Sequence, residues 1–131
     1  MTLTEEYRLY LEPIFNRKPR SVAALDVRSL TSYTDLVVIV EAGSGRQVSA
    51  LSDHIVRALK KKKIKALGVE GVQEGEWALL DYGDLIIHVF DSEAKAFYDL
   101  EGLWNDAPRL DLSDFQTGMP VPDFSLEDDD D

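Results

Sequence analysis

The chain has 131 residues, 44% of them hydrophobic, which suits a single compact domain with its own core. The absence of cysteine excludes disulfides and thiolate chemistry and fits a reducing compartment, so we expect a cytoplasmic protein. The net charge of −11 argues against direct binding to nucleic acid phosphates and is compatible with a basic protein partner. Because acids occur early and no run of roughly 20 apolar residues is present, we expect neither a signal peptide nor a membrane helix.

The acidic residues are concentrated towards the C-terminal end. Residues 111–131 hold eight of the 25 acids and no lysine or arginine, which leaves 17 acidic against 14 basic residues in residues 1–110. The same stretch is rich in Asp, Pro, Ser and Gly. We therefore predict a folded domain over residues 1–110 and a mostly disordered acidic tail over residues 111–131. We favour solubility as the role of the tail over modulation of basic contacts.

The first predicted elements are a helix and two strands. Apolar and aromatic residues recur at helical spacing over residues 4–15, and Pro19 follows as a stop. Residues 22–27, VAALDV, have the pattern of a strand. Residues 36–42, LVVIVEA, form a nearly continuous β-branched run, which predicts an inner strand that is covered on both faces.

A long amphipathic helix is predicted next. Ser44 is a good N-cap, and Gln47 stands three residues further on, as in a capping box. One apolar stripe is formed by Val48, Leu51, Ile55 and Leu59. Lys60 to Lys63 lie at the C-terminal end, where cations complement the helix dipole. Because four adjacent lysines point all round a helix, we interpret them as a solvated helix end rather than an RNA contact.

Three further strands and a helix complete the predicted domain. The strands are expected over residues 66–70, 76–82 and 85–90. A strand–helix–strand unit normally places its strands parallel. The last helix is expected over residues 92–104, capped by Asp91 or Ser92, with Phe97, Leu100 and Trp104 at helical spacing. The pattern predicts one α/β domain with a mixed sheet of about five strands flanked by helices.

The stretch EGEWALLDYGDLIIHVF, residues 74–90, predicts a tight hairpin. A two-residue loop at Gly83-Asp84 pairs Trp77 with Phe90 and Leu79 with His88 on one face, which also carries Asp81 and Ile86. The opposite face is apolar and should pack against helices; it consists of Ala78, Leu80, Tyr82, Leu85, Ile87 and Val89. The mixed face fits both a protein-binding surface and a second core face with a hydrogen-bonded histidine, and both interpretations remain open.

The residue pattern argues against catalysis. His54 and His88 have no HxH, HExxH or cysteine partners, so structural roles are favoured, and we expect no metal, no cofactor and no catalytic residues. Gly43 and Gly45 at a helix start suit phosphate, but no complete phosphate-binding motif surrounds them. Nucleotidyltransferases place two carboxylates after such a Gly-Ser turn to hold Mg²⁺, and that pair is missing here. We predict that the protein is not an enzyme; the alternative is a nucleotide-binding protein of nucleotidyltransferase-like fold.

Three stretches carry a family resemblance: SYTDLVVIVEAGSGRQVSALSDHIVRALKK, LGVEGVQEGEWALLDYGDLIIHVF and YDLEGLW. Together they resemble the ribosomal silencing factor (RsfS, or Iojap) family. The resemblance covers roughly residues 20–105 and is specific, because several separate motifs occur in the family's order. The acidic tail has no counterpart in the expected pattern.

The resemblance implies a fold similar to that of nucleotidyltransferases without their active site. It also implies binding to the large ribosomal subunit through ribosomal protein L-fourteen, at the face that would meet the small subunit. Such binding blocks subunit association and represses translation by steric means, without turnover. Organelle members act in ribosome assembly, but no transit peptide is visible, which favours the bacterial cytoplasm.

The resemblance also suggests where the partner is bound. Because the ribosomal protein is basic, acids are expected around an apolar anchor. The predicted anchor is Trp77, supported by Leu79. The other predicted partner-binding residues are Glu70, Asp81, Tyr82 and Asp84. Replacing Trp77 by Ala should then weaken binding by about 2 kcal/mol or more with the fold intact. A homodimer through the same face is a further hypothesis, and neither sequence-specific nucleic acid binding nor membrane binding is expected.

Tyr98 and Trp104 also match family positions. They fit core positions on the last helix at least as well as contact positions.

Overall fold

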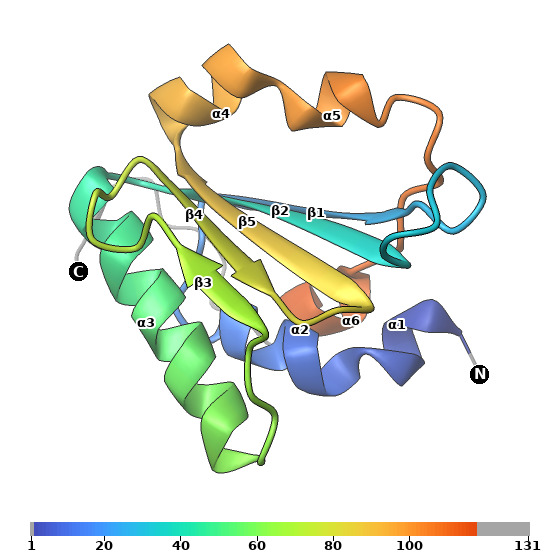
Figure 1. The fold of residues 1–131 in the computed structure, drawn as a ribbon, viewed down its shortest axis with the longest axis horizontal. Helices are drawn as coiled ribbons and strands as arrows, with labels where there is room; N and C mark the ends of the chain where they lie inside the picture. Colours follow the sequence, from blue (N-terminus) through green and yellow to red (C-terminus); the bar gives the residue numbers. More distant parts are fainter. Residues whose placement is uncertain (1, 118–131) are drawn as a thin grey trace.

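The centre of the structure, a computed structural model that describes residues 2–117, is a five-stranded sheet with the order β1-β2-β5-β4-β3 (Figure 1). The strands are β1 (Ser21–Asp26), β2 (Leu36–Ala42), β3 (Gly68–Glu70), β4 (Trp77–Asp81) and β5 (Leu85–Asp91). β2 and β5 are parallel, whereas the other three neighbouring pairs are antiparallel. The predicted mixed α/β sheet is therefore confirmed.

Helices cover the sheet on both sides, as predicted (Figure 1). They are α1 (Leu3–Glu6), α2 (Arg8–Phe15), α3 (Gly45–Lys61), α4 (Ser92–Tyr98), α5 (Leu100–Leu103) and α6 (Ser113–Thr117). Residues of α2, α3 and α6 pack on the face that carries Leu80 and Ile87, which we name the inner face. Residues of α4 and α5 pack on the opposite face, which we name the outer face and which carries Trp77 and His88.

The inner face carries the larger core. Fully buried strand residues that point to it are Leu36, Val38, Val40, Leu80, Leu85, Ile87 and Val89. Against them packs the predicted stripe of α3, formed by Val48, Leu51, Ile55 and Leu59. The nearly continuous apolar run of β2 is explained by its position, because it lies between β1 and β5 and is covered on both faces.

The predicted helix caps are present with one difference. The Ser44 Oγ accepts a hydrogen bond from the Gln47 N–H at 3.2 Å, and the Asp91 carboxylate accepts one from the Ala94 N–H at 2.8 Å. The Gln47 side chain does not close a capping box on Ser44. Its Oε1 accepts from the Gly43 N–H at 2.7 Å instead, so the turn before α3 is fixed by hydrogen bonds within itself.

The two strands of the predicted strand–helix–strand unit, β2 and β3, are not neighbours in the sheet. β3 has the same direction as β2, because β2 is parallel to β5 and two antiparallel pairings separate β5 from β3. β5 and β4 lie between them in the sheet. β3 thus forms one edge, and the other edge strand, β1, is bridged to Arg109 through Leu25.

Two helices that were predicted as continuous are interrupted. The first helix is interrupted at Tyr7, whose side chain is buried and whose backbone leaves helical geometry. The last helix is interrupted at Asp99, which adopts a left-handed conformation (φ 46°) and uses its side chain to cap Gly102. These interruptions follow from side chains that bond or pack locally, which hydrophobic spacing alone does not reveal.

The described structure continues beyond the predicted boundary at residue 110. Leu112 and Phe115 are buried in the inner core, and the Phe115 ring stacks on Phe15 with ring centroids 5.3 Å apart. The predicted tail therefore contributes α6 to the fold. The rest of that prediction, over residues 118–131, lies outside the described residues.

Candidate functional site

The β4–β5 hairpin has the predicted register. Trp77 pairs with Phe90 and Leu79 with His88, and the Tyr82 N–H donates to the Leu85 carbonyl at 2.9 Å to close the two-residue loop. Gly83 has φ +87°, a conformation that glycine adopts without a steric penalty. The alternation therefore separates an inner apolar set from an outer set in which aromatic and polar side chains lie side by side.

An aromatic cluster lies on the outer face and is formed by Trp77, His88, Phe90, Phe97 and Tyr98. The Trp77 ring lies 5.1 Å from Phe90 and 4.5 Å from Tyr98, measured between centroids. Phe97 meets Tyr98 at 5.0 Å with its ring nearly perpendicular. Two strands and α4 thus contribute to one continuous aromatic surface, which runs from the buried Phe90 to the exposed Phe97.

A hydrogen bond inside this cluster fixes the state of His88. The Trp77 indole N–H donates to the His88 Nδ1 at 3.0 Å, which requires Nδ1 to be unprotonated. Burial lowers the pKa of His88 to about 4, so the ring is neutral at physiological pH and keeps accepting this bond. The packing of Trp77 against His88 fits a second core face with a hydrogen-bonded histidine. The rim of the cluster is exposed, and the protein-binding interpretation stays a prediction.

The exposed rim comes from the helices, and sequence reasoning missed it. Phe97 is 80% exposed and Tyr98 40% exposed on α4, and Leu103 on α5 is 71% exposed. Helical spacing groups Phe97 with Leu100 and Trp104, but Phe97 is exposed, and the left-handed turn at Asp99 separates its helix from α5. Leu100 and Trp104 do pack against the outer core. The signal that precedes the change of direction is Asp99 followed three residues later by Gly102, a cap-like pair.

Among the predicted acids, two share the outer face. Glu70 on β3 pairs with Leu79, and Asp81 lies two residues after Leu79 on the same face. The Asp81 carboxylate also accepts from the Gly83 N–H at 2.8 Å and so stabilises the loop. Asp84 lies in that loop and is exposed, and its carbonyl accepts from Asp35 and Leu36.

Tyr82 lies apart from the other predicted site residues. It is 9% exposed in the inner core, where its ring meets Tyr10 edge-on at 5.6 Å. Its hydroxyl is buried without a hydrogen bond partner among the described residues, and burial raises its pKa to about 12. The structure therefore brings Glu70, Trp77, Leu79 and Asp81 together and places Tyr82 on the other side of the sheet.

The turn before α3 offers little room for a phosphate group. The Gly43 N–H and the Gln47 N–H already donate to partners within the turn. A Cβ atom at Gly45 would lie only 2.8 Å from the Gly75 carbonyl oxygen, so the loop before β4 covers the start of the helix. Within residues 2–117, no group of three or more His, Cys, Asp or Glu side chains is arranged to hold a metal ion. No helix in this part of the chain is long and apolar enough to cross a membrane.

Comparison with known proteins gives a match to one protein family. A family model described as "Ribosomal silencing factor during starvation" matches residues 3–129. This match is longer than the resemblance over residues 20–105 that the motifs indicate. It also reaches into the acidic segment, so the expectation that this segment has no counterpart in the family was wrong.

Individual relatives agree with the family model. The ribosomal silencing factor RsfS of Halalkalibacterium halodurans is 30% identical over 112 residues, which cover 86% of this chain and 96% of the relative. The protein of the same name from Bacillus subtilis is 33% identical, with 74% and 82% of the two chains covered. A crystal structure of a protein from Chromobacterium violaceum is 33% identical and has a TM-score of 0.74, with 80% of this chain and 88% of that chain covered.

Proposed function

The chain belongs to the ribosomal silencing factor (RsfS) family, and we propose that it binds the large ribosomal subunit through ribosomal protein L-fourteen and blocks association with the small subunit. Membership of this family supports a role in translation control at the ribosome. The action is steric and needs no turnover, which fits a non-catalytic protein. The observation that carries the proposal is the exposed aromatic rim of the outer face, a face that also carries Glu70 and Asp81.

We name the proposed contact surface the docking face and define it by Glu70, Trp77, Leu79, Asp81, Phe97 and Tyr98. Exposed aromatic side chains supply most of the binding energy in many interfaces, particularly when polar groups surround them. Phe97 and Tyr98 are the most accessible aromatic members, and Glu70 and Asp81 provide negative charge on the same face of the sheet. A basic protein surface such as that of a ribosomal protein complements this arrangement.

In this proposal, Trp77 lies beneath the exposed residues of the docking face and supports them by packing. Its indole N–H is bonded to His88, and its ring is packed between Phe90 and Tyr98. Replacing Trp77 by Ala would remove this packing and leave the buried His88 Nδ1 without its donor, which lowers stability as well as binding. Phe97 is the better test residue, because it is 80% exposed.

The test compares Phe97→Asp with Leu9→Asp. Leu9 is an apolar residue on α2, on the other side of the sheet, and is 49% exposed. We expect Phe97→Asp to weaken binding to purified large subunits by about 30-fold, equivalent to about 2 kcal/mol, as for an interface hot spot. Leu9→Asp should bind like the wild type. Titration of both variants and the wild type with isolated ribosomal protein L-fourteen tests whether this protein is the partner.

Subunit joining provides the functional measurement. Wild-type protein added to purified subunits should reduce the joined peak on a sucrose gradient, and Phe97→Asp should need a correspondingly higher concentration for the same effect. Equal potency of wild type and Phe97→Asp would remove Phe97 from the contact. Binding to the large subunit without any loss of joining would contradict the steric mechanism.

Two alternatives make distinct predictions. A nucleotide-binding protein would give a calorimetric signal with ATP or CTP and Mg²⁺, and the covered turn at Gly43 to Gln47 argues against that outcome. A homodimer through the docking face would dissociate when Phe97 is replaced by Asp. Light scattering of wild type and variant over a range of concentrations measures this directly.

A further inference from the structure

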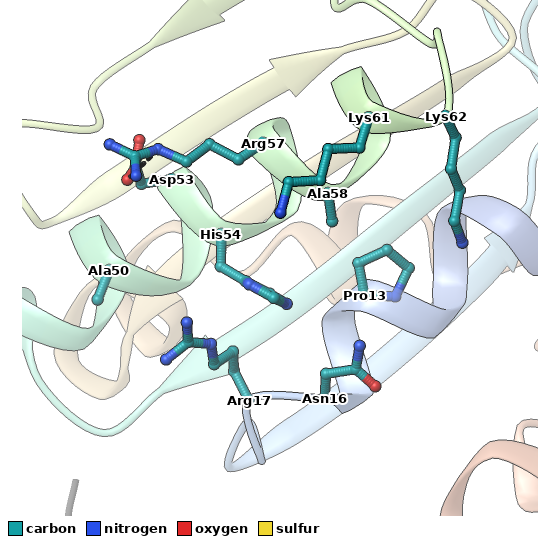
Figure 2. Close-up of a pocket in the computed structure, with 10 residues that line it drawn as sticks. All are labelled: Pro13, Asn16, Arg17, Ala50, Asp53, His54, Arg57, Ala58, Lys61 and Lys62. Carbon is teal, nitrogen blue, oxygen red and sulfur yellow. Dashed lines mark ion pairs between the residues drawn. The ribbon is translucent and has the colours of Figure 1, made fainter.

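A basic groove lies between α2 and α3, away from the docking face. It has a volume of about 570 Å³ and is lined by both helices and by the residues that follow α2. Its cations are Arg17, Arg57, Lys61 and Lys62. Figure 2 shows Arg17 and Lys61 extending towards His54 from opposite sides, which concentrates positive charge around one imidazole ring.

Much of this charge is not neutralised within the described part of the chain. Arg57 pairs with Asp53 at 3.0 Å, and Lys62 approaches Glu12 at 3.8 Å. Arg17 and Lys61 have no ion-pair partner among residues 2–117. An anion in the groove would therefore interact with two unpaired cations and two others that are only partly compensated.

His54 is a second, independent feature of the groove. Its Nε2 is buried and makes no hydrogen bond among the described residues. A buried polar nitrogen without a partner is unfavourable, and an acceptor in the groove would satisfy it. The pKa of His54 is lowered by burial first and then by Arg17 and Lys61, whereas Asp53 raises it. A bound carboxylate would oppose the effect of these two cations.

The end of the described chain packs on α2, which forms one wall of this groove. Phe115 of α6 stacks on Phe15, and the Arg8 guanidinium lies 5.1 Å from the Phe115 ring centroid. Phe15 is followed directly by Asn16 and Arg17, which line the groove. Fourteen residues, 118–131, follow α6 and span up to about 45 Å when extended, whereas α3 is only about 25 Å long.

These residues have the complementary charge. Residues 118–131 contain six acids, Asp123, Glu127 and Asp128 to Asp131, and no lysine or arginine. We propose that the groove between α2 and α3 is a carboxylate-binding site and that the acidic C-terminal segment of this same chain, residues 123–131, is its ligand. The proposal does not depend on the proposed ribosomal function.

Tethering and net charge favour this occupant over RNA. A short covalent connection gives an effective concentration in the millimolar range, so weak ion pairs suffice to hold the segment. Removing the six acids from the total of 25 leaves 19 acidic against 14 basic residues in residues 1–117. A separate polyanion therefore approaches a negatively charged molecule, which disfavours its association.

A single spin label tests the contact. The chain has no cysteine, so Ser125→Cys in the full-length protein gives one attachment site for a nitroxide. We expect strong broadening of the NMR signals of Arg17, His54 and Lys61 at low salt, and little broadening of signals from α5 on the outer face. Because the contact is between exposed charges, about 0.5 M salt should remove most of the broadening.

Matched variants separate this contact from a non-specific one. The labelled protein with Arg17→Gln and Lys61→Gln should lose the broadening. The control is Arg28, an exposed cation that follows β1 and pairs with Asp26; the labelled protein with Arg28→Gln should retain the broadening. In unlabelled protein, replacing the six tail acids by Asn or Gln should change the His54 imidazole shifts and strengthen binding of a short RNA duplex about tenfold. Broadening that is absent, or that spreads evenly over the surface, overturns the proposal. Broadening that disappears on dilution also overturns it, because the segment would then come from a second copy.

Discussion

The two faces of the sheet are built from the same strands but differ in what covers them. The inner face packs against α2, α3 and α6, and its strand residues are almost all fully buried. The outer face is covered by short helices that leave Phe97 and Leu103 mostly exposed. The inner face therefore contributes stability, whereas the outer face combines a small core with an accessible aromatic rim. In the proposed function, the outer face is therefore the one that a partner would contact.

The largest expected effect is on the inner face. Leu80 is fully buried there, so Leu80→Ala should lower the free energy of unfolding by about 2–5 kcal/mol through lost burial and the cavity left behind. Leu103→Ala, at a residue 71% exposed on α5, should change it by no more than about 0.5 kcal/mol. Urea unfolding at pH 7 measures both. Equal losses for the two variants would contradict the contrast between the faces.

The next largest effect concerns the pH dependence of stability, which tests the buried part of the outer face. Because the pKa of His88 is about 4 in the folded protein and near 6.5 when unfolded, the unfolded state binds more protons between these values. Stability from the neutral ring is complete above about pH 6.5 and is lost as the pH falls towards 4, by on the order of 3 kcal/mol. In His88→Gln, the side-chain oxygen can still accept from Trp77 but does not titrate.

The difference in unfolding free energy between wild type and His88→Gln isolates this contribution from the acidic groups that also titrate. We expect the wild type to lose stability relative to the variant as the pH falls from 7 to 4. A difference that stays constant over this range would mean that His88 titrates normally and is open to water. NMR titration of the imidazole gives the folded-state pKa directly.

The smallest expected effect concerns Tyr82. Its hydroxyl is buried without a hydrogen bond partner among the described residues, so Tyr82→Phe removes an unsatisfied polar group. We expect stability to be unchanged or to rise by about 1 kcal/mol. Because Tyr82 lies on the inner face, binding to the large subunit should be unchanged. A substantial loss of binding in a stably folded Tyr82→Phe variant would show that the inner face takes part in docking.

Regular local patterns were predicted most accurately. The register of the β4–β5 hairpin followed from a short loop at Gly83-Asp84 and strict alternation, since a side-chain period of two leaves little freedom once the turn is placed. The caps of α3 and α4 followed from Ser44 and Asp91 for a similar local reason. The candidate site was only partly predicted, since Trp77, Leu79 and the nearby acids were named but exposure of Phe97 was not.

The elements that were missed depend on contacts between distant residues. Leu112 and Phe115 belong to an acidic stretch that looks disordered, yet their apolar side chains complete the inner core beside Phe15. The basic groove likewise unites Arg17, after α2, with His54 and Lys61 on α3. No local pattern brings these residues together, because their proximity follows from helix packing.

Local sequence patterns were enough to predict the α/β class, the strands and the face to which each hairpin side chain points, because alternation and capping act over a few residues. The sheet order, the exposure of Phe97 and the packing of α6 became known only from the folded arrangement. Those features depend on which apolar surfaces meet, and the free energy of burial is gained only when separated parts of the chain come into contact.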